Sequence, residues 1–161
     1  MASPKNPDTS QLRCWAEIDL SKLRYNADFL RKEAGDRCGI MAIVKADAYG
    51  HGLEHVVSCL MGHVDWFGVA NYQEAKRALK AAGNQSPSIL VLSPPTPAEI
   101  DLIVESELSA SVSSIKEVTA FGEAAARLGT RARLHAVADT GMGRMGSLPD
   151  HFWELVAAIK V

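Results

Sequence analysis

The sequence has few cysteines and few aromatic residues. Its 161 residues include three cysteines, Cys14, Cys38 and Cys59, and no CxxC pair. An odd number of widely spaced thiols predicts neither a disulfide framework nor a zinc site, so we expect isolated buried thiols. Aromatic side chains make up only 6% of the chain, and the core must therefore be built mainly from Ala, Val, Ile and Leu.

An excess of charge and a long apolar run are also missing. The 17 basic and 19 acidic residues give a net charge of −2, which argues against nucleic acid or an anionic membrane as the main partner. No apolar run approaches the about 18 residues that a membrane span needs. The first eleven residues, MASPKNPDTSQ, lack the apolar segment of a secretory signal. We expect a soluble, reduced, cytoplasmic protein with no membrane partner.

The chain alternates short apolar runs with helical patterns. Residues 1–12 are rich in Pro, Ser, Asn and Asp and are predicted to be a disordered tail, which leaves residues 13–161 as one domain. The alternation of CWAEIDL predicts a half-exposed strand over Cys14–Leu20, after which Ser21 caps a helix that ends near Ala34. Further strands are predicted at 40–44, 66–70, 89–92, 108–112 and 133–138. Further helices are predicted at 53–61, 73–82, 96–104 and 114–128, and from Pro149 onward.

The pattern predicts an α/β fold with a parallel sheet. Strands without polar alternation that are joined by helices are typical of a parallel sheet covered on its faces. Either a doubly wound open sheet or part of a (β/α)8 barrel satisfies this pattern. Because a complete barrel takes about 250 residues, this chain would hold about five of its eight units. Composition alone does not choose between the two architectures.

The densest chemical feature is the segment IVKADAYGHG, which contains Lys45 and Tyr49. Lys45 directly follows an apolar strand, at the end where active sites lie in both architectures. Partial burial there would disfavour the ammonium form and make the amine a better nucleophile. Gly50 and Gly52 precede a predicted helix start, where backbone amides can bind an anion. A lysine beside a phosphate site suits pyridoxal 5'-phosphate (PLP). The alternative is a solvated lysine followed by a glycine turn.

Three segments together resemble the alanine racemases. VKADAYGHG resembles their PLP-lysine signature, WAEIDLSKLRYN resembles the opening of their sequences, and DTGMGRMG at 139–146 resembles their second signature. The resemblance runs from about residue 14 to the last residue. It implies a parallel (β/α)8 barrel of fold-type III, of which about five units are present here. Residues 13–161 would be part of the N-terminal PLP-binding barrel domain.

The resemblance also implies roles for single residues. Lys45 would hold PLP as a Schiff base and act as one of two catalytic bases. Tyr49 would bind near the cofactor phosphate. Arg144 would lie by the cofactor's phenolic oxygen and the substrate carboxylate, with Met142 nearby. A guanidinium suits a carboxylate bidentately, although a surface ion pair is the alternative for Arg144. The substrate would be alanine, interconverted for peptidoglycan, and the full-length parent would be a homodimer.

The sequence departs from that family in two ways. Val137 stands where many members have a lysine that orients the arginine, so Arg144 must be oriented otherwise or be less well fixed. The family also continues beyond the point where this sequence stops, with three more barrel units and a β-rich domain. Those parts supply the arginine that faces the pyridine nitrogen and the tyrosine base of the opposite face. We therefore expect an N-terminal fragment that is inactive alone.

Rival interpretations remain open at this point. A racemase of broader specificity, and a non-catalytic PLP-binding protein of cofactor homeostasis, share the lysine signature. Gly141, Gly143 and Gly146 form a GxGxxG pattern, but a dinucleotide site should open the first strand–helix unit rather than follow the fifth strand. His51 and His55 are four residues apart without an evident third ligand, so no metal site is expected.

Overall fold

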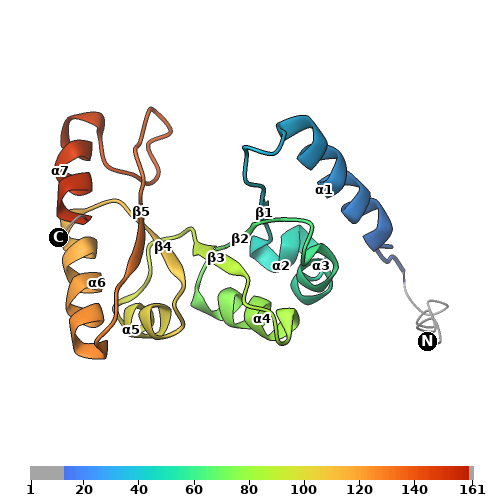
Figure 1. Ribbon diagram of the computed structural model, residues 1–161, viewed down its shortest axis with the longest axis horizontal. Helices are drawn as coiled ribbons and strands as arrows, with labels where there is room; N and C mark the ends of the chain where they lie inside the picture. The colour runs from blue at the N-terminus through green and yellow to red at the C-terminus, as the bar shows by residue number, and fades with distance from the viewer. Residues whose placement is uncertain (1–12, 160–161) are drawn as a thin grey trace.

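The computed structural model describes residues 13–159, in which five strands alternate with seven helices (Figure 1). The strands are β1 (Met41–Ile43), β2 (Trp66–Val69), β3 (Ser88–Val91), β4 (Ser109–Val112) and β5 (Arg133–Ala136). The helices are α1 (Leu20–Ala34), α2 (Lys45–Gly50), α3 (Leu53–Leu60), α4 (Tyr72–Ala82), α5 (Pro97–Glu105), α6 (Ile115–Leu128) and α7 (Pro149–Ile159). The five strands from β1 onward, and the starts of the helices α3 to α7, agree with the sequence prediction to within about two residues, whereas α2 lies where a loop was predicted.

The strands form one parallel sheet in the order β1-β2-β3-β4-β5. A doubly wound sheet reverses its strand order at a switch point, whereas a barrel adds each strand next to the preceding one. The sequential order therefore decides between the two architectures in favour of part of a (β/α)8 barrel. In Figure 1 the strands form a row from β1 on the right to β5 on the left, and α3 to α6 follow its outer side.

The core lies between the outer face of the sheet and the helices. Alternate strand residues point to this face, and they are apolar and almost completely buried: Val44, Phe67, Val69, Ile89, Val91, Ala110 and Val112. The helices supply small or branched residues such as Val57, Ala75 and Ile103, together with the aromatic ring of Phe121. Neighbouring helices along the chain also pack on one another, as α3 does on α4 and α5 on α6. The core is mostly aliphatic, as the low aromatic content predicted.

The inner face of the sheet is less covered and more polar. It carries Met41 and Ile43 of β1, Trp66 of β2, Ser109 and Ser111 of β4, and Arg133 and His135 of β5. Ile43 is 39% exposed although it belongs to a strand. In the described part of the chain, β1 pairs only with β2, and β5 pairs only with β4. Both edges of the sheet are therefore open within residues 13–159.

The predicted first strand is wrong. Residues 14–19 have no regular structure, and the chain enters α1 at Leu20. Asp19, not Ser21, is the N-cap: its carboxylate accepts hydrogen bonds from the amides of Ser21 and Lys22 and from the Ser21 hydroxyl. Polar alternation alone misled the prediction, because a strand also needs a partner and none pairs with this segment among the described residues. The predicted tail at 1–12 lies outside the described residues.

The prediction of buried thiols is correct for one cysteine of three. Cys59 is buried on α3, where its Sγ donates to the Leu20 carbonyl across the contact with α1. Cys14 and Cys38 are exposed because they lie in segments without regular structure. All three thiols are free. In the described residues, no helix is both long enough and apolar enough to cross a membrane.

Candidate active site

Lys45 lies at the carboxyl end of β1. The Val44 amide continues the sheet by donating a 2.8 Å hydrogen bond to the Gly68 carbonyl, and the Val44 side chain is 1% exposed in the core. Strand alternation therefore places Lys45 on the inner face, with Met41 and Ile43. Its side chain is half-buried. Within residues 13–159 no ion pair engages its amine.

The segment α2, which begins at Lys45, is a left-handed turn and not a regular right-handed helix. Four consecutive residues, Ala46, Asp47, Ala48 and Tyr49, have φ values of 51°, 56°, 53° and 55°. The sequence predicts a glycine loop here and not this turn, because alanine and tyrosine give no signal for such a conformation. Each L-residue in it costs about 1–2 kcal/mol relative to the right-handed form. A strained backbone of this kind persists only where surrounding contacts hold it.

Hydrogen bonds from α3 and α4 hold the turn. The Glu74 carboxylate of α4 accepts from the Ala46 amide at 2.8 Å and from the Ala70 amide, at the end of β2, also at 2.8 Å. The Asp47 carboxylate accepts from the Leu53 amide at the start of α3 at 3.1 Å. Arg77 of α4 donates to Asp47 at 2.6 Å and to both oxygens of Glu54 at 2.6 and 2.7 Å.

These contacts fix the charge states beside Lys45. The Leu53 amide, and after it Arg77, hold the pKa of the Asp47 carboxyl below its usual value. Arg77 lowers the pKa of Glu54 to about 2, and the two carboxylates raise the pKa of Arg77 in return. All three groups lie at the surface, so solvent screens their attraction. The network therefore orients the turn more than it stabilises the fold.

Arg144 and Met142 lie on a loop that follows β5. Ala138 forms a bridge with Ser147, and the Asp139 amide donates to the Ser147 carbonyl at 2.8 Å, so the loop closes at its base. The Asp139 carboxylate accepts from the amides of Gly141 at 2.9 Å and Gly143 at 3.1 Å. These bonds, first that of Gly141, hold the pKa of Asp139 below its usual value. The signature DTGMGRMG thus forms a loop built around its own aspartate.

Gly146 is required at the closure of this loop. Its φ is 111°, and a Cβ there would lie 2.7 Å from the Asp139 nitrogen and 2.9 Å from the Ala138 carbonyl carbon. Its amide donates to the Ser113 hydroxyl at 3.0 Å, which ties the loop to the end of β4. The GxGxxG pattern therefore serves the closure of a loop, and the next helix begins only at Pro149.

The predicted site residues follow the carboxyl ends of strands at opposite sides of the sheet, β1 and β5. Lys45 and Tyr49 follow β1, while Met142 and Arg144 follow β5, and parallel strands bring both carboxyl ends to the same edge. Tyr49 is 60% exposed and Met142 is 76% exposed. Within residues 13–159, no hydrogen bond or ion pair joins these four side chains. Val137 donates its amide to the Val112 carbonyl and offers no side-chain bond to Arg144.

The residues at the carboxyl end of β1 fit PLP. The aldehyde of PLP needs a primary amine that is not engaged in an ion pair, and Lys45 supplies one on a clamped backbone. The hydroxyl of Tyr49, four residues later in the same segment, is a donor of the kind that a phosphate accepts. In the described residues, no three His, Cys, Asp or Glu side chains gather as a metal site would need.

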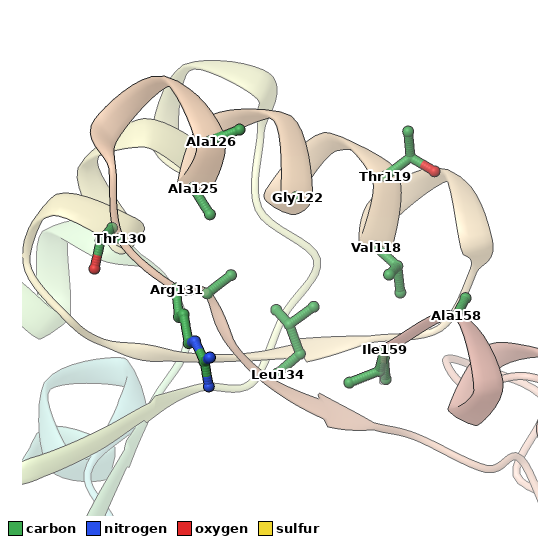
Figure 2. A pocket seen from close by; sticks show the side chains of 11 residues that line it. Val118, Thr119, Gly122, Ala125, Ala126, Thr130, Arg131, Leu134, Ala158 and Ile159 are labelled. Carbon is green, nitrogen blue, oxygen red and sulfur yellow. The ribbon is translucent and has the colours of Figure 1, made fainter. Parts of the chain in front are cut away.

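Two grooves of the structure lie away from these residues. One, of about 700 Å³, opens between α6, α7 and the free edge of β5, and Figure 2 shows Val118, Leu134 and Ile159 facing into it. A second of the same volume lies at the amino ends of β3 to β5, beside the ion pair of Arg133 with Glu107. Neither groove contains Lys45 or Arg144, so pocket size does not mark the site.

Fold and site together define a parallel (β/α) barrel segment with a free lysine at the carboxyl end of its first strand and an arginine loop after its fifth. The sequence profile described as "Alanine racemase, N-terminal domain" matches residues 18–161. The chain belongs to the alanine racemase family. This confirms the resemblance drawn from the two signatures and the expected fold class.

Curated relatives and solved structures agree. The chain is 38% identical over 149 residues to an alanine racemase of Methylacidiphilum infernorum and 40% identical over 157 residues to one of Cutibacterium acnes. These alignments cover 92% and 96% of this chain, but only 38% and 40% of the relatives. The solved alanine racemase of Clostridium difficile 630 superposes with a TM-score of 0.83 at 29% identity, over 91% of this chain and 38% of that one. The chain thus spans about two fifths of the length of these relatives.

Proposed function

We propose that the protein to which this chain belongs interconverts L- and D-alanine with PLP, and that Lys45 carries the cofactor. The observation that supports this most is the free, half-buried amine at the carboxyl end of β1, on a turn that the rest of the chain holds in place. The second signature, at the same edge of the sheet, supplies the guanidinium that a substrate carboxylate needs.

Each residue has a distinct part in this proposal. PLP, when bound, supplies the electron sink that lowers the pKa of the C–H group at the substrate α-carbon. Lys45 binds the cofactor and then moves the α-proton on one face of the substrate. Arg144 binds the substrate carboxylate, with Met142 beside it, and Tyr49 donates to the cofactor phosphate. Within residues 13–159 no ion pair engages the guanidinium of Arg144, so it is available to an incoming anion.

Racemisation needs a second base, since the proton leaves one face and returns to the other. Lys45 can serve only one face, so the proposal assigns the second base to a tyrosine outside this chain, in the partner subunit of a homodimer. Residues 13–161 would then be the first five units of a barrel that further units complete. The open edge of β5 and the apolar groove beside it fit the next strand–helix unit. The complete enzyme would act in the cytoplasm and supply peptidoglycan synthesis.

A second candidate is racemisation of another amino acid. A histidine racemase of Leuconostoc mesenteroides subsp. sake superposes on this chain with a TM-score of 0.74 at 28% identity, and covers 88% of it. The same barrel segment therefore occurs in an enzyme named for a different substrate. A panel of amino acids tested on the complete enzyme separates the two candidates, since only an alanine racemase will favour alanine over histidine and serine.

The cofactor assignment can be tested on the chain itself. Incubation with PLP, reduction with borohydride and peptide mass mapping should place a phosphopyridoxyl group on Lys45. The Lys45→Ala variant should lose this label, while Lys76→Ala, a change at an exposed lysine of α4, should keep it. Labelling of other lysines only would contradict the proposal. The 161-residue chain should release no D-alanine from L-alanine, and detectable racemisation would refute the need for a second base from outside it.

A further inference from the structure

We propose that Glu74 is a positioning residue for Lys45: its carboxylate fixes the backbone angle at which the reactive lysine leaves β1. This inference rests on the proposed role of Lys45. Glu74 lies outside both signatures, in the first turn of α4, and is separated from Lys45 by the whole of α3 and β2. Only the folded chain brings the two together.

The geometry of the carboxylate carries the inference. Oε1 accepts from the amide of Ala46 at 2.8 Å, and Oε2 accepts from the amide of Ala70 at 2.8 Å. One side chain thus ties the residue after Lys45 to the end of the neighbouring strand. Glu74 is itself fixed, because its amide donates to the Asn71 side chain at 3.0 Å as part of the helix cap.

Ala46 is the residue where control of the backbone matters most. It is the first of the four left-handed residues, and an alanine would otherwise prefer a right-handed or extended conformation. The hydrogen bond to Glu74 holds its amide in the direction that the left-handed turn requires. If that bond were lost, Ala46 would relax, and the adjoining peptide of Lys45 would rotate with it. The amine would then spend less time in its reactive position.

Glu99 and Glu117 provide an internal comparison. Each occupies the same third position of its helix as Glu74. Glu99 accepts from the amides of Thr96 at 2.9 Å and Tyr72 at 3.3 Å, and Glu117 accepts from the amides of Ser113 and Ser114. All three carboxylates brace strand–helix connections. Of the three, Glu74 alone binds the residue next to the proposed cofactor lysine. It therefore braces a strand–helix connection, as the other two do, and in addition positions Lys45.

The test compares Glu74→Gln with Glu99→Gln. A glutamine has nearly the same shape but a single acceptor oxygen, so its amide group must face one of the two backbone N–H groups. Both variants lose one charge-assisted hydrogen bond in matched positions, and a purely structural role predicts equal effects. Two quantities are measured on the chain: the rate at which PLP is trapped on Lys45 by borohydride, and amide hydrogen exchange in the peptide 44–52 without PLP.

In Glu74→Gln we expect trapping about tenfold slower and faster exchange in peptide 44–52, as loss of one charge-assisted hydrogen bond implies. In Glu99→Gln both quantities should stay within about twofold of the unsubstituted chain, since its bonds lie at other loops. Equal changes in the two variants, or unchanged trapping in Glu74→Gln, would overturn the positioning role. If the unsubstituted chain is not labelled at Lys45 at all, the proposed function fails first, and this inference fails with it.

Discussion

The indole ring of Trp66 and the imidazole ring of His135 meet edge to face, with their centroids 5.6 Å apart and their planes at 72°. Trp66 belongs to β2 and His135 to β5, so two further strands lie between them. In a flat sheet, three steps of about 4.8 Å would separate the two strands by about 14 Å. The two rings meet because the sheet curves toward its inner face. This contact shows that the sheet has the kind of curvature that a barrel requires.

The first prediction concerns the energy of this ring pair. Edge-to-face aromatic pairs contribute about 0.5–1.5 kcal/mol beyond the area that they bury. A double-mutant cycle of Trp66→Ala and His135→Ala, measured by urea unfolding, should give a coupling energy of at least about 0.5 kcal/mol. Tyr25→Ala serves as the control, because Tyr25 is 67% exposed and belongs to neither ring pair of residues 13–159, and its change should stay within about 0.5 kcal/mol. Additive effects of the two substitutions would show that the rings do not interact in solution.

The second prediction concerns the closure of the Arg144 loop. Gly146→Ala places a Cβ against backbone atoms of Ala138 and Asp139 that have no room to move, at a φ that alanine rarely adopts. We expect it to lower the free energy of unfolding by about 1–3 kcal/mol, and to weaken any binding that depends on Arg144. Thermal unfolding measures the first effect.

Gly122→Ala is the matched control for that substitution. Gly122 lies inside α6, and a Cβ there would meet no atom within 4 Å. Alanine is favoured over glycine in a helix by about 1 kcal/mol, so this variant should be more stable than the unsubstituted chain. Opposite signs for the two glycines are the expected result. A Gly146→Ala chain as stable as the unsubstituted one would show that the loop is not closed as described.

The third prediction concerns strain beside Lys45. Glycine adopts positive φ without the penalty that alanine carries, so Ala46→Gly should raise the free energy of unfolding by up to about 1 kcal/mol. The same exchange at exposed Ala126, inside α6, should lower it by a similar amount. Urea unfolding measures the free energy of unfolding of both variants against that of the unsubstituted chain. A loss of stability in Ala46→Gly would contradict the left-handed turn.

The fourth prediction is a pH dependence. The pKa of Glu54 is lowered to about 2 by Arg77, so its contribution to stability is complete above about pH 4.5 and is lost as pH falls toward 2. Glu54→Gln removes the ionisable group, and its unfolding free energy should fall less over that range than that of the unsubstituted chain. Because the pair is exposed, 1 M salt should shrink the difference. Identical profiles at low salt would show that the ion pair contributes nothing.

The sequence by itself determined the five strands, the helices after them and the chemistry of the site residues. The strands place apolar residues on their outer face, and several helix starts carry a local cap, as Thr96 and Ser114 do, so these elements depend on neighbours within about four residues. The signatures around Lys45 and Arg144 could be read for the same reason, because they are continuous in the chain. The local pattern failed at Cys14–Leu20, since whether a strand forms depends on a distant partner.

Only the tertiary structure decided how those elements are arranged. The sequential strand order makes the sheet a barrel segment rather than a doubly wound sheet. This order depends on which strands pair, and pairing cannot be predicted from a local sequence pattern. The left-handed turn after Lys45 was hidden for the same reason. Its residues do not favour that conformation, and they adopt it because Glu74 and Arg77, about thirty residues later, hold their backbone and side chains in place. Contacts between residues far apart in the chain overrule local preference at the point where the proposed chemistry occurs.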